Sequence, residues 1–183
     1  MKKSIISFAI TVIALCMVHT VSAQEFNKGT NVINAGFGIG GSFSPSGFGS
    51  ATAGLGLSAS YERGIWEVGG PGVISLGGYL GTTAYDGDFG IGNDDFSWRY
   101  YIVGARAAYH FNGLNVENLD VYGGAMLSLN IASYDGNNDV DIDTFPSGSV
   151  YVGGRWYFNE NFGVFAEAGY GVAFLTLGAA FRF

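Results

Sequence analysis

Apolar and polar residues alternate with a period of two along most of this chain, and residues 173–183 show the pattern most clearly. Phe183, Phe181, Leu177 and Leu175 share one face of that segment, while small or polar residues fill the other face. A period of two predicts a β-strand with one apolar face. About ten residues is also the length that a tilted strand needs to cross a bilayer.

The same alternation predicts eight strands in all. A tight turn at residues 159–161 leads to a seventh strand, and the eighth ends at Phe183. An even number of strands with both chain ends on one side is typical of bacterial barrels. We expect connections at residues 63–72 and 112–118 and loops at 42–47, 86–95 and 135–148, which are rich in Gly, Pro, Asn, Asp and Ser. The first six strands are expected at residues 32–41, 51–62, 73–85, 97–111, 119–134 and 150–158.

Aromatic residues recur on the apolar face at one end of alternate strands. Because these strands would all run toward the same side of a membrane, the aromatics would form a girdle at one interface. The fold class that we predict is therefore all-β, an eight-stranded antiparallel transmembrane β-barrel with up-and-down meander order. The residues of this girdle are Tyr61, Tyr109, Phe111, Trp156, Phe158, Phe181 and Phe183.

The first 23 residues have the features of a cleaved signal peptide. Lys2 and Lys3 precede an apolar run that is too short to span a membrane as a helix, and Val21-Ser22-Ala23 offers small residues for cleavage. We therefore expect residues 1–23 to be removed and residues 24–183 to form a single barrel domain.

Removal of this segment changes the charge and the cysteine content. The 8 Lys and Arg residues become 6 against 15 Asp and Glu, so the formal charge falls from −7 to −9, and the chain's 1 cysteine, Cys16, is lost. Disulfides then cannot stabilise the exported chain. The scarcity of basic residues argues against nucleic acid as a partner. A mean hydropathy of +0.26 without a long apolar helix favours a membrane barrel.

Over residues 30–183 the chain resembles the small eight-stranded outer-membrane barrels of the OmpA and OmpX type. The signal peptide, the alternating strands and the terminal Ala179-Ala180-Phe181-Arg182-Phe183 carry the resemblance. It implies localisation in the bacterial outer membrane, contact with lipid and lipopolysaccharide, and a monomeric state. It also implies that the barrel-assembly machinery recognises Phe181 and Phe183.

The interior of an eight-stranded barrel is just wide enough for side chains to fill it. Arg155 and Glu167 both lie on the polar face of their strands, so we predict that they pair inside the barrel and help to plug it. A turn of residues 160–162 would place them directly opposite each other, and a turn of residues 159–161 would place them on a diagonal. We therefore predict a closed lumen and no open, porin-like channel.

Catalytic, cofactor and metal sites are not expected. His110, the one histidine outside the signal segment, has no Ser or Asp partner that the sequence alone identifies. Oxygen-bearing side chains recur at every second position, at Asp135, Asn137, Asp139, Asp141 and Asp143, but Val140 and Pro146 break the EF-hand pattern, so a solvated loop is favoured over a Ca²⁺ site. The predicted role is structural or surface-interacting. The alternative is a soluble periplasmic or secreted barrel that binds a small apolar ligand, as lipocalins do.

Overall fold

The computed structural model describes residues 26–41, 52–53, 55–88, 95–134 and 142–183. The predicted signal peptide at residues 1–23, the predicted loop at residues 42–47 and the first half of the predicted loop at 135–148, residues 135–141, lie outside the described residues. One short 3-10 turn, η1 (Asn112–Leu114), accompanies the strands. The strands are β1 (Asn31–Ile39), β2 (Thr52–Ala53), β3 (Gly56–Val68), β4 (Gly72–Asp88), β5 (Asp95–Phe111), β6 (Leu119–Tyr134), β7 (Ile142–Tyr157), β8 (Phe162–Tyr170) and β9 (Leu175–Arg182).

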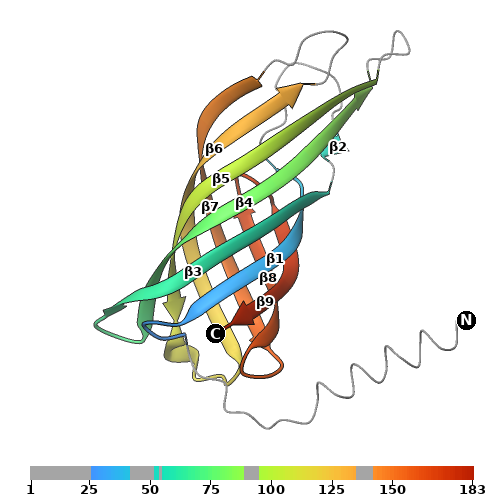
Figure 1. Cartoon of the computed structure of the whole chain (residues 1–183). Helices are drawn as coiled ribbons and strands as arrows, with labels where there is room; N and C mark the ends of the chain where they lie inside the picture. Colours follow the sequence, from blue (N-terminus) through green and yellow to red (C-terminus); the bar gives the residue numbers. More distant parts are fainter. Residues whose placement is uncertain (1–25, 42–51, 54, 89–94, 135–141) are drawn as a thin grey trace, which may run out of the picture.

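These strands form a closed antiparallel barrel (Figure 1). From β3 to β9 each strand pairs with the next along the chain, and β1 pairs with both β3 and β9, so the sheet has no gap around its circumference. At the β1–β9 seam, Ile33 lies opposite Phe181 and Phe37 lies opposite Leu177. The two-residue β2 pairs with the upper part of β4, on the side where β3 pairs below it. The predicted eight-stranded meander is therefore confirmed.

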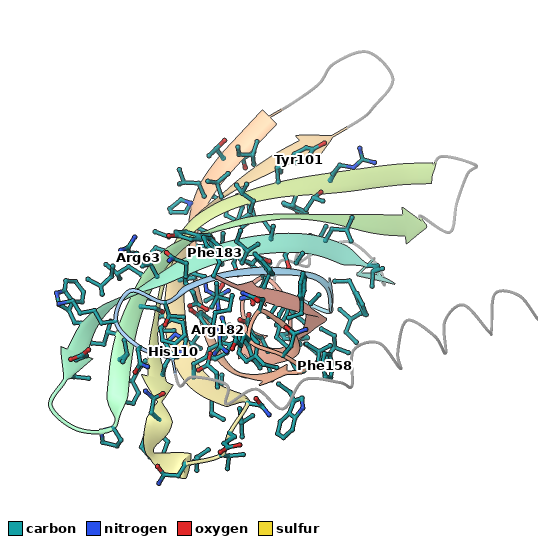
Figure 2. All side chains as sticks on the ribbon, turned by 60° about the horizontal axis from the view of Figure 1, so that its bottom comes forward. Arg63, Tyr101, His110, Phe158, Arg182 and Phe183 are labelled. Carbon is teal, nitrogen blue, oxygen red and sulfur yellow. The ribbon has the colours of Figure 1, made fainter. Side chains whose placement is uncertain are left out.

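Side chains alternate between the outside and the lumen as the sequence pattern predicts. Leu127 and Val152 are 76% and 64% exposed on the outer surface, whereas Tyr122 and Asn130 are buried inside. Met126 occupies an inward position despite being apolar, and it is buried. Figure 2 shows the same division from the lower end, with His110 and Arg182 inside the ring of strands and Phe158 outside.

Strand β3 is longer than the sequence predicts. We expected a connection at residues 63–72, but β3 continues to Val68 and pairs with β4 throughout. The register shifts between Gly64 and Trp66, so Ile65 is an extra residue on the bulged strand. That bulge interrupts the alternation, which is why the sequence there does not look like a strand.

Strand β7 also begins earlier than predicted. The sequence predicts residues 142–148 in a loop because they contain Asp, Thr, Pro, Ser and Gly, but they pair with β6 from Ser133 to Leu127. Pairing with β8 starts only at Val150, so this part of β7 has no β8 partner on its other side. Pro146 is compatible with a strand at such an edge.

The barrel is taller on one side. Strands β4 to β7 have 16 or 17 residues, whereas β1, β8 and β9 have 8 or 9. At about 3.3 Å per residue the long strands reach roughly 55 Å, well beyond the ten or so residues that cross a bilayer. This tall wall extends past the rest of the barrel at the upper end, opposite the C-terminus (Figure 1).

Candidate functional site

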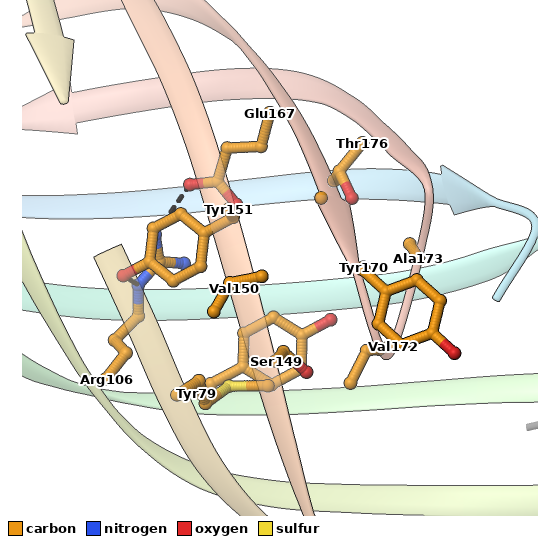
Figure 3. A pocket seen from close by; sticks show the side chains of 12 residues that line it. Tyr79, Arg106, Ser149, Val150, Tyr151, Glu167, Tyr170, Val172, Ala173 and Thr176 are labelled. Atoms are coloured by element: carbon orange, nitrogen blue, oxygen red, sulfur yellow. Dashed lines mark hydrogen bonds and ion pairs between the residues drawn. The ribbon is translucent and has the colours of Figure 1, made fainter. Parts of the chain in front are cut away.

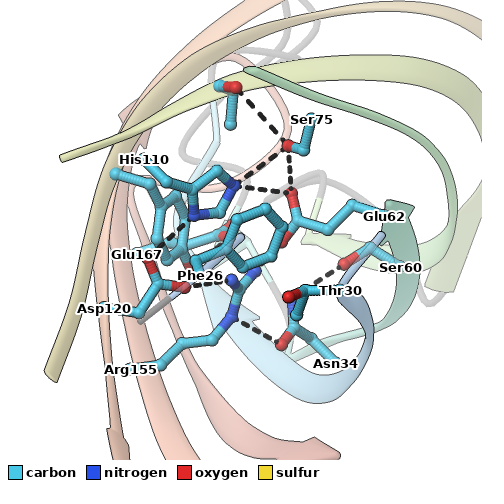
Figure 4. Close-up of polar contacts among 12 residues, drawn as sticks. Phe26, Thr30, Asn34, Ser60, Glu62, Ser75, His110, Asp120, Arg155 and Glu167 are labelled. Carbon is cyan, nitrogen blue, oxygen red and sulfur yellow. Dashed lines mark hydrogen bonds and ion pairs between the residues drawn. The ribbon is translucent and has the colours of Figure 1, made fainter. Parts of the chain in front are cut away.

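The lower half of the lumen contains a group of buried polar and charged side chains that we call the lower cluster (Figure 4). Each member comes from a different strand, and none is more than 5% exposed. Inward positions on six strands thus bring together residues that are far apart in the sequence. The members are Asn34 on β1, Glu62 on β3, Ser75 on β4, His110 on β5, Asp120 on β6 and Arg155 on β7.

Arg155 lies at the centre of the lower cluster and is fully buried. Its Nη1 is 2.6 Å from Asp120 Oδ2, and its Nε donates to Asn34 Oδ1 at 3.1 Å. Its Nη2 forms an ion pair with Glu62. The guanidinium also covers the ring of Tyr122, with Cζ 4.2 Å from the centroid. Charged partners and an aromatic face together replace the water that Arg155 loses on burial.

His110 joins the two carboxylates of the cluster. Its Nδ1 is 2.8 Å from Asp120 Oδ1, and its Nε2 is 3.0 Å from Ser75 Oγ and 3.6 Å from Glu62 Oε2. The Ser75 hydroxyl in turn donates to Glu62 Oε2 at 3.0 Å. Phe26, from the segment before β1, stacks on the imidazole with centroids 3.5 Å apart.

The sequence analysis identified no Ser or Asp partner for His110, and this was wrong. Ser75, His110 and Asp120 form a hydrogen-bonded series in the order of a catalytic triad. Ser75 and His110 are however 0% exposed, which leaves a substrate no access to the hydroxyl. The neighbouring Glu62 carboxylate would also oppose the negative charge of an acyl-transfer transition state. The geometry therefore supports a structural network.

A second charged group lies farther up the lumen (Figure 3). We call it the upper cluster, and its members are Arg106, Tyr151 and Glu167. Arg106 Nη2 is 2.6 Å from Glu167 Oε1, and Arg106 Nε donates to the Tyr151 hydroxyl at 3.0 Å. The Tyr122 hydroxyl donates to the same Glu167 oxygen at 2.8 Å. Because Tyr122 also lies against Arg155, it connects the two clusters.

The predicted pair of Arg155 with Glu167 is not formed. Both side chains point into the lumen, and the β7–β8 register is the diagonal one, with Gly153 opposite Glu167 and Arg155 opposite Phe165. Glu167 pairs instead with Arg106 across the lumen, and Arg155 pairs with Glu62 and Asp120. The prediction considered only the β7–β8 hairpin. Asp120 lies directly opposite Arg155 on β6, the other neighbour of β7, whereas Glu62 comes from β3 across the lumen.

Those missed residues had a signal in the sequence. Continuing the inward positions Ser58 and Ser60 by two residues reaches Glu62, and stepping back by two from the inward Tyr122 reaches Asp120. A buried arginine needs carboxylate partners, so the inward positions of every strand had to be searched. Phe26 has no such signal, because it precedes the first predicted strand.

The upper part of the lumen is less completely filled. A cavity of about 40 Å³ is lined by Tyr79, Ser149 and Thr176 together with the upper cluster. The buried side-chain polar atoms of Asn130 and the hydroxyl of Ser149 have no protein partner there. A cavity of this size, in the same region as unpaired polar atoms, has room for a water molecule. The described lumen therefore has room for water above and tight packing below.

The outer surface of the lower end carries the predicted girdle. Tyr61, Tyr109, Phe158 and Phe183 are between 39% and 56% exposed, and Trp66 and Phe162 extend the band. The ring of Phe181 contacts both Phe162 and Phe183, with centroid distances of 4.8 and 5.7 Å. Aromatic rings in such a band suit the boundary between lipid and water.

In the described part of the chain, no helix is long and apolar enough to span a membrane. Within the same residues no three His, Cys, Asp or Glu side chains are grouped so that they could hold a metal ion. Asp143, the one aspartate of the predicted acidic loop among them, is exposed on β7.

No protein-family model and no curated protein matches the sequence. The structure is similar to that of Ail, the attachment invasion locus protein of Yersinia pestis, in complex with the heparin analogue sucrose octasulfate. That similarity has a TM-score of 0.55 at 17% identity and covers 85% of this chain and 99% of Ail. A second Ail structure matches with a TM-score of 0.49, 17% identity and coverage of 85% and 99%. The N-terminal β-barrel domain of Pseudomonas aeruginosa OprF also gives a TM-score of 0.49, at 14% identity and coverage of 86% and 98%.

The closed meander, the apolar outer surface and the likeness to Ail agree on one architecture. The chain therefore has the fold of an eight-stranded antiparallel β-barrel, similar to that of Ail.

Proposed function

We propose that the chain is an integral protein of the bacterial outer membrane with a structural or surface-interacting role, and that its own side chains close its lumen. One observation carries the closed lumen: the lower cluster fills the barrel with Glu62, His110, Asp120 and Arg155, each 5% exposed or less. A fully hydrogen-bonded wall and an apolar outer face meet the requirements of lipid.

The alternative, a soluble barrel that binds a small apolar ligand, requires large apolar residues inside. In this chain Leu80, Leu127, Leu129 and Val152 lie outside and are each more than half exposed. The interior instead presents two charged clusters and a cavity of about 40 Å³. A drug-sized ligand needs a mostly apolar pocket of some 300 Å³ or more. The arrangement of faces therefore favours the membrane protein.

Surface interaction is assigned to the upper end, where the tall wall of β4 to β7 extends beyond the short strands. The adjoining segments 86–95 and 135–143 are rich in aspartate. A negative surface repels polyanions and attracts cationic partners or divalent ions. We therefore propose that any ligand of this end differs in charge from the sulfated sugar that accompanies Ail in its structure.

Ion conductance tests the closed lumen. The full-length barrel reconstituted into planar lipid bilayers should give no stable conductance, because the lower cluster leaves no continuous water path. A general porin in the same bilayers is the positive control. Stable open channels from the folded barrel would refute the closed lumen. In a separate experiment on cells, release of the protein by osmotic shock would refute the proposed membrane location.

Substitution of Phe183 by alanine separates the two roles proposed for this residue. Phe183 and Phe162 are 56% and 57% exposed at the same interface, and both rings contact Phe181. Recognition by the assembly machinery would depend on Phe183 alone, whereas interfacial anchoring would depend on both. We expect Phe183→Ala to lower the amount in the outer membrane fraction without altering export, and Phe162→Ala to lower it much less. Equal effects of the two variants would leave only anchoring.

Double-mutant cycles test the ion-pair partners. Arg155→Ala should lower the free energy of unfolding by about 3–5 kcal/mol, because it leaves buried carboxylates without a partner. We expect coupling energies of about 1–3 kcal/mol for Arg155→Ala with Asp120→Asn and for Arg106→Ala with Glu167→Gln. The cross pair, Arg155→Ala with Glu167→Gln, should couple more weakly. The measurement is urea unfolding in lipid vesicles, and a cross pair that couples most strongly would contradict the assigned partners.

A further inference from the structure

Phe26 is among the most deeply buried side chains, although it belongs to no strand. It is 1% exposed and forms the lower apolar core with Val32, Val73, Tyr157 and Ala180. Its ring lies nearly parallel to that of His110, with an interplanar angle of 5°. A residue that precedes β1 therefore occupies the lower mouth of the barrel and covers the lower cluster from below (Figure 4).

Hydrogen bonds from the barrel hold the segment that carries Phe26. Asn112 Nδ2 donates to the Phe26 carbonyl at 3.0 Å. The Gly29 amide donates to the Gly64 carbonyl at 2.9 Å, and the Gly64 amide donates to the Thr30 carbonyl at 3.0 Å. These hydrogen bonds come from two parts of the lower mouth: the bulge in β3 and the turn that follows β5.

Gly64 gives this segment the room that it needs. A Cβ at residue 64 would lie 2.3 Å from the Asn27 carbonyl oxygen, closer than any real contact. The bulge in β3 thus places a residue without a side chain where the backbone of the segment packs against the wall. Together with the Asn112 amide and the face of His110, it forms a socket that fits one aromatic residue and its backbone.

We propose that residues 26–30 are a tethered plug and that the lower mouth is a binding site for an aromatic peptide segment, which the chain itself occupies. The ring packs on the imidazole, the carbonyl accepts from Asn112, and the plug separates Ser75, His110 and Asp120 from bulk water. With the predicted cleavage after Ala23, two residues precede Phe26, so the plug is a short free end that docks into the finished barrel.

This proposal concerns access to the lower mouth and not conduction through the barrel. The Arg155 network lies above the plug and would still close the lumen if the plug were withdrawn. A bilayer without conductance is therefore compatible with both a docked and an undocked plug, and access has to be measured by itself.

Thiol labelling measures that access. The side chain of Val73 is 3% exposed and lies on the lumen side of the plug. A chain that carries both Cys16→Ser and Val73→Cys contains a single thiol. We expect a membrane-impermeant maleimide, added to the folded barrel from the lower side, to label Val73→Cys about tenfold faster when Phe26→Ala is also present. Lys28→Ala, an exposed change in the same segment, should leave the thiol protected. Val116→Cys, exposed at the lower turn, should react equally in every background.

Equal labelling of Val73→Cys with and without Phe26→Ala would overturn the plug, because the strands alone would then seal the mouth. A synthetic peptide with the sequence of residues 24–30 should protect the thiol of the Phe26→Ala barrel. The same peptide with Ala in place of Phe should not. Failure of the aromatic peptide to protect would overturn the binding site.

A second readout applies if Phe26→Ala fails to fold. A ring stacked at 3.5 Å shifts the imidazole proton resonances of His110 upfield through its ring current. Phe26→Leu keeps the apolar bulk and removes the ring, so we expect a downfield shift of these resonances in the folded variant. Unchanged His110 resonances would show that Phe26 is not docked on His110 in the folded protein.

Discussion

Closure of the sheet between β1 and β9 is the constraint on which the rest of this structure depends. A strand edge in lipid leaves amide and carbonyl groups without partners, and each costs several kcal/mol, so the first and last strands have to meet. They do so from Val32 opposite Arg182 to Ile39 opposite Leu175. With eight strands around the barrel the resulting interior is narrow. Every inward side chain must then fit against those of the opposite wall, which explains why inward glycines such as Gly36 and Gly153 face aromatic rings.

Charge inside this narrow space is balanced locally. The inward side chains of the described lumen include three arginines, Arg106, Arg155 and Arg182, and each covers a tyrosine ring at 4.2 Å. Glu62, Asp120 and Glu167 supply three carboxylates. An arginine keeps its charge even when it is fully buried, so the barrel must provide anions and aromatic faces in place of water. The consequence is a series of arginine and tyrosine side chains that runs through the lower half of the barrel and leaves the unfilled volume above it.

The sequence predicts the fold much better than it predicts the interior. Period-two alternation identifies the strands because each one has an apolar outer face and a lumen face, and residues 119–134 were bounded correctly. Alternation fails where the backbone departs from it, at the β3 bulge, and where a polar strand extends beyond the short strands of the barrel, at residues 142–148. It also says which residues point inward without saying which of them meet. Asp120 lies directly opposite Arg155 on the adjacent strand β6, so the register of that hairpin sets the contact. Arg155 reaches Glu62 because the closed barrel brings β3 and β7 around one axis, and local spacing along the chain carries no record of that.

The Ser75–His110–Asp120 series shows why geometry alone does not define a catalytic site. Distances of 3.0 and 2.8 Å match those of a triad, yet the hydroxyl is shared with Glu62 and the imidazole is covered by Phe26. In a hydrolase the nucleophile faces a cavity, and donors surround the position where negative charge develops. Here the nucleophile faces a carboxylate, and the rings of Phe26 and Tyr122 lie against the imidazole. The same three residue types therefore act as connectors, and they join β4, β5 and β6 at the level where the barrel is most tightly packed.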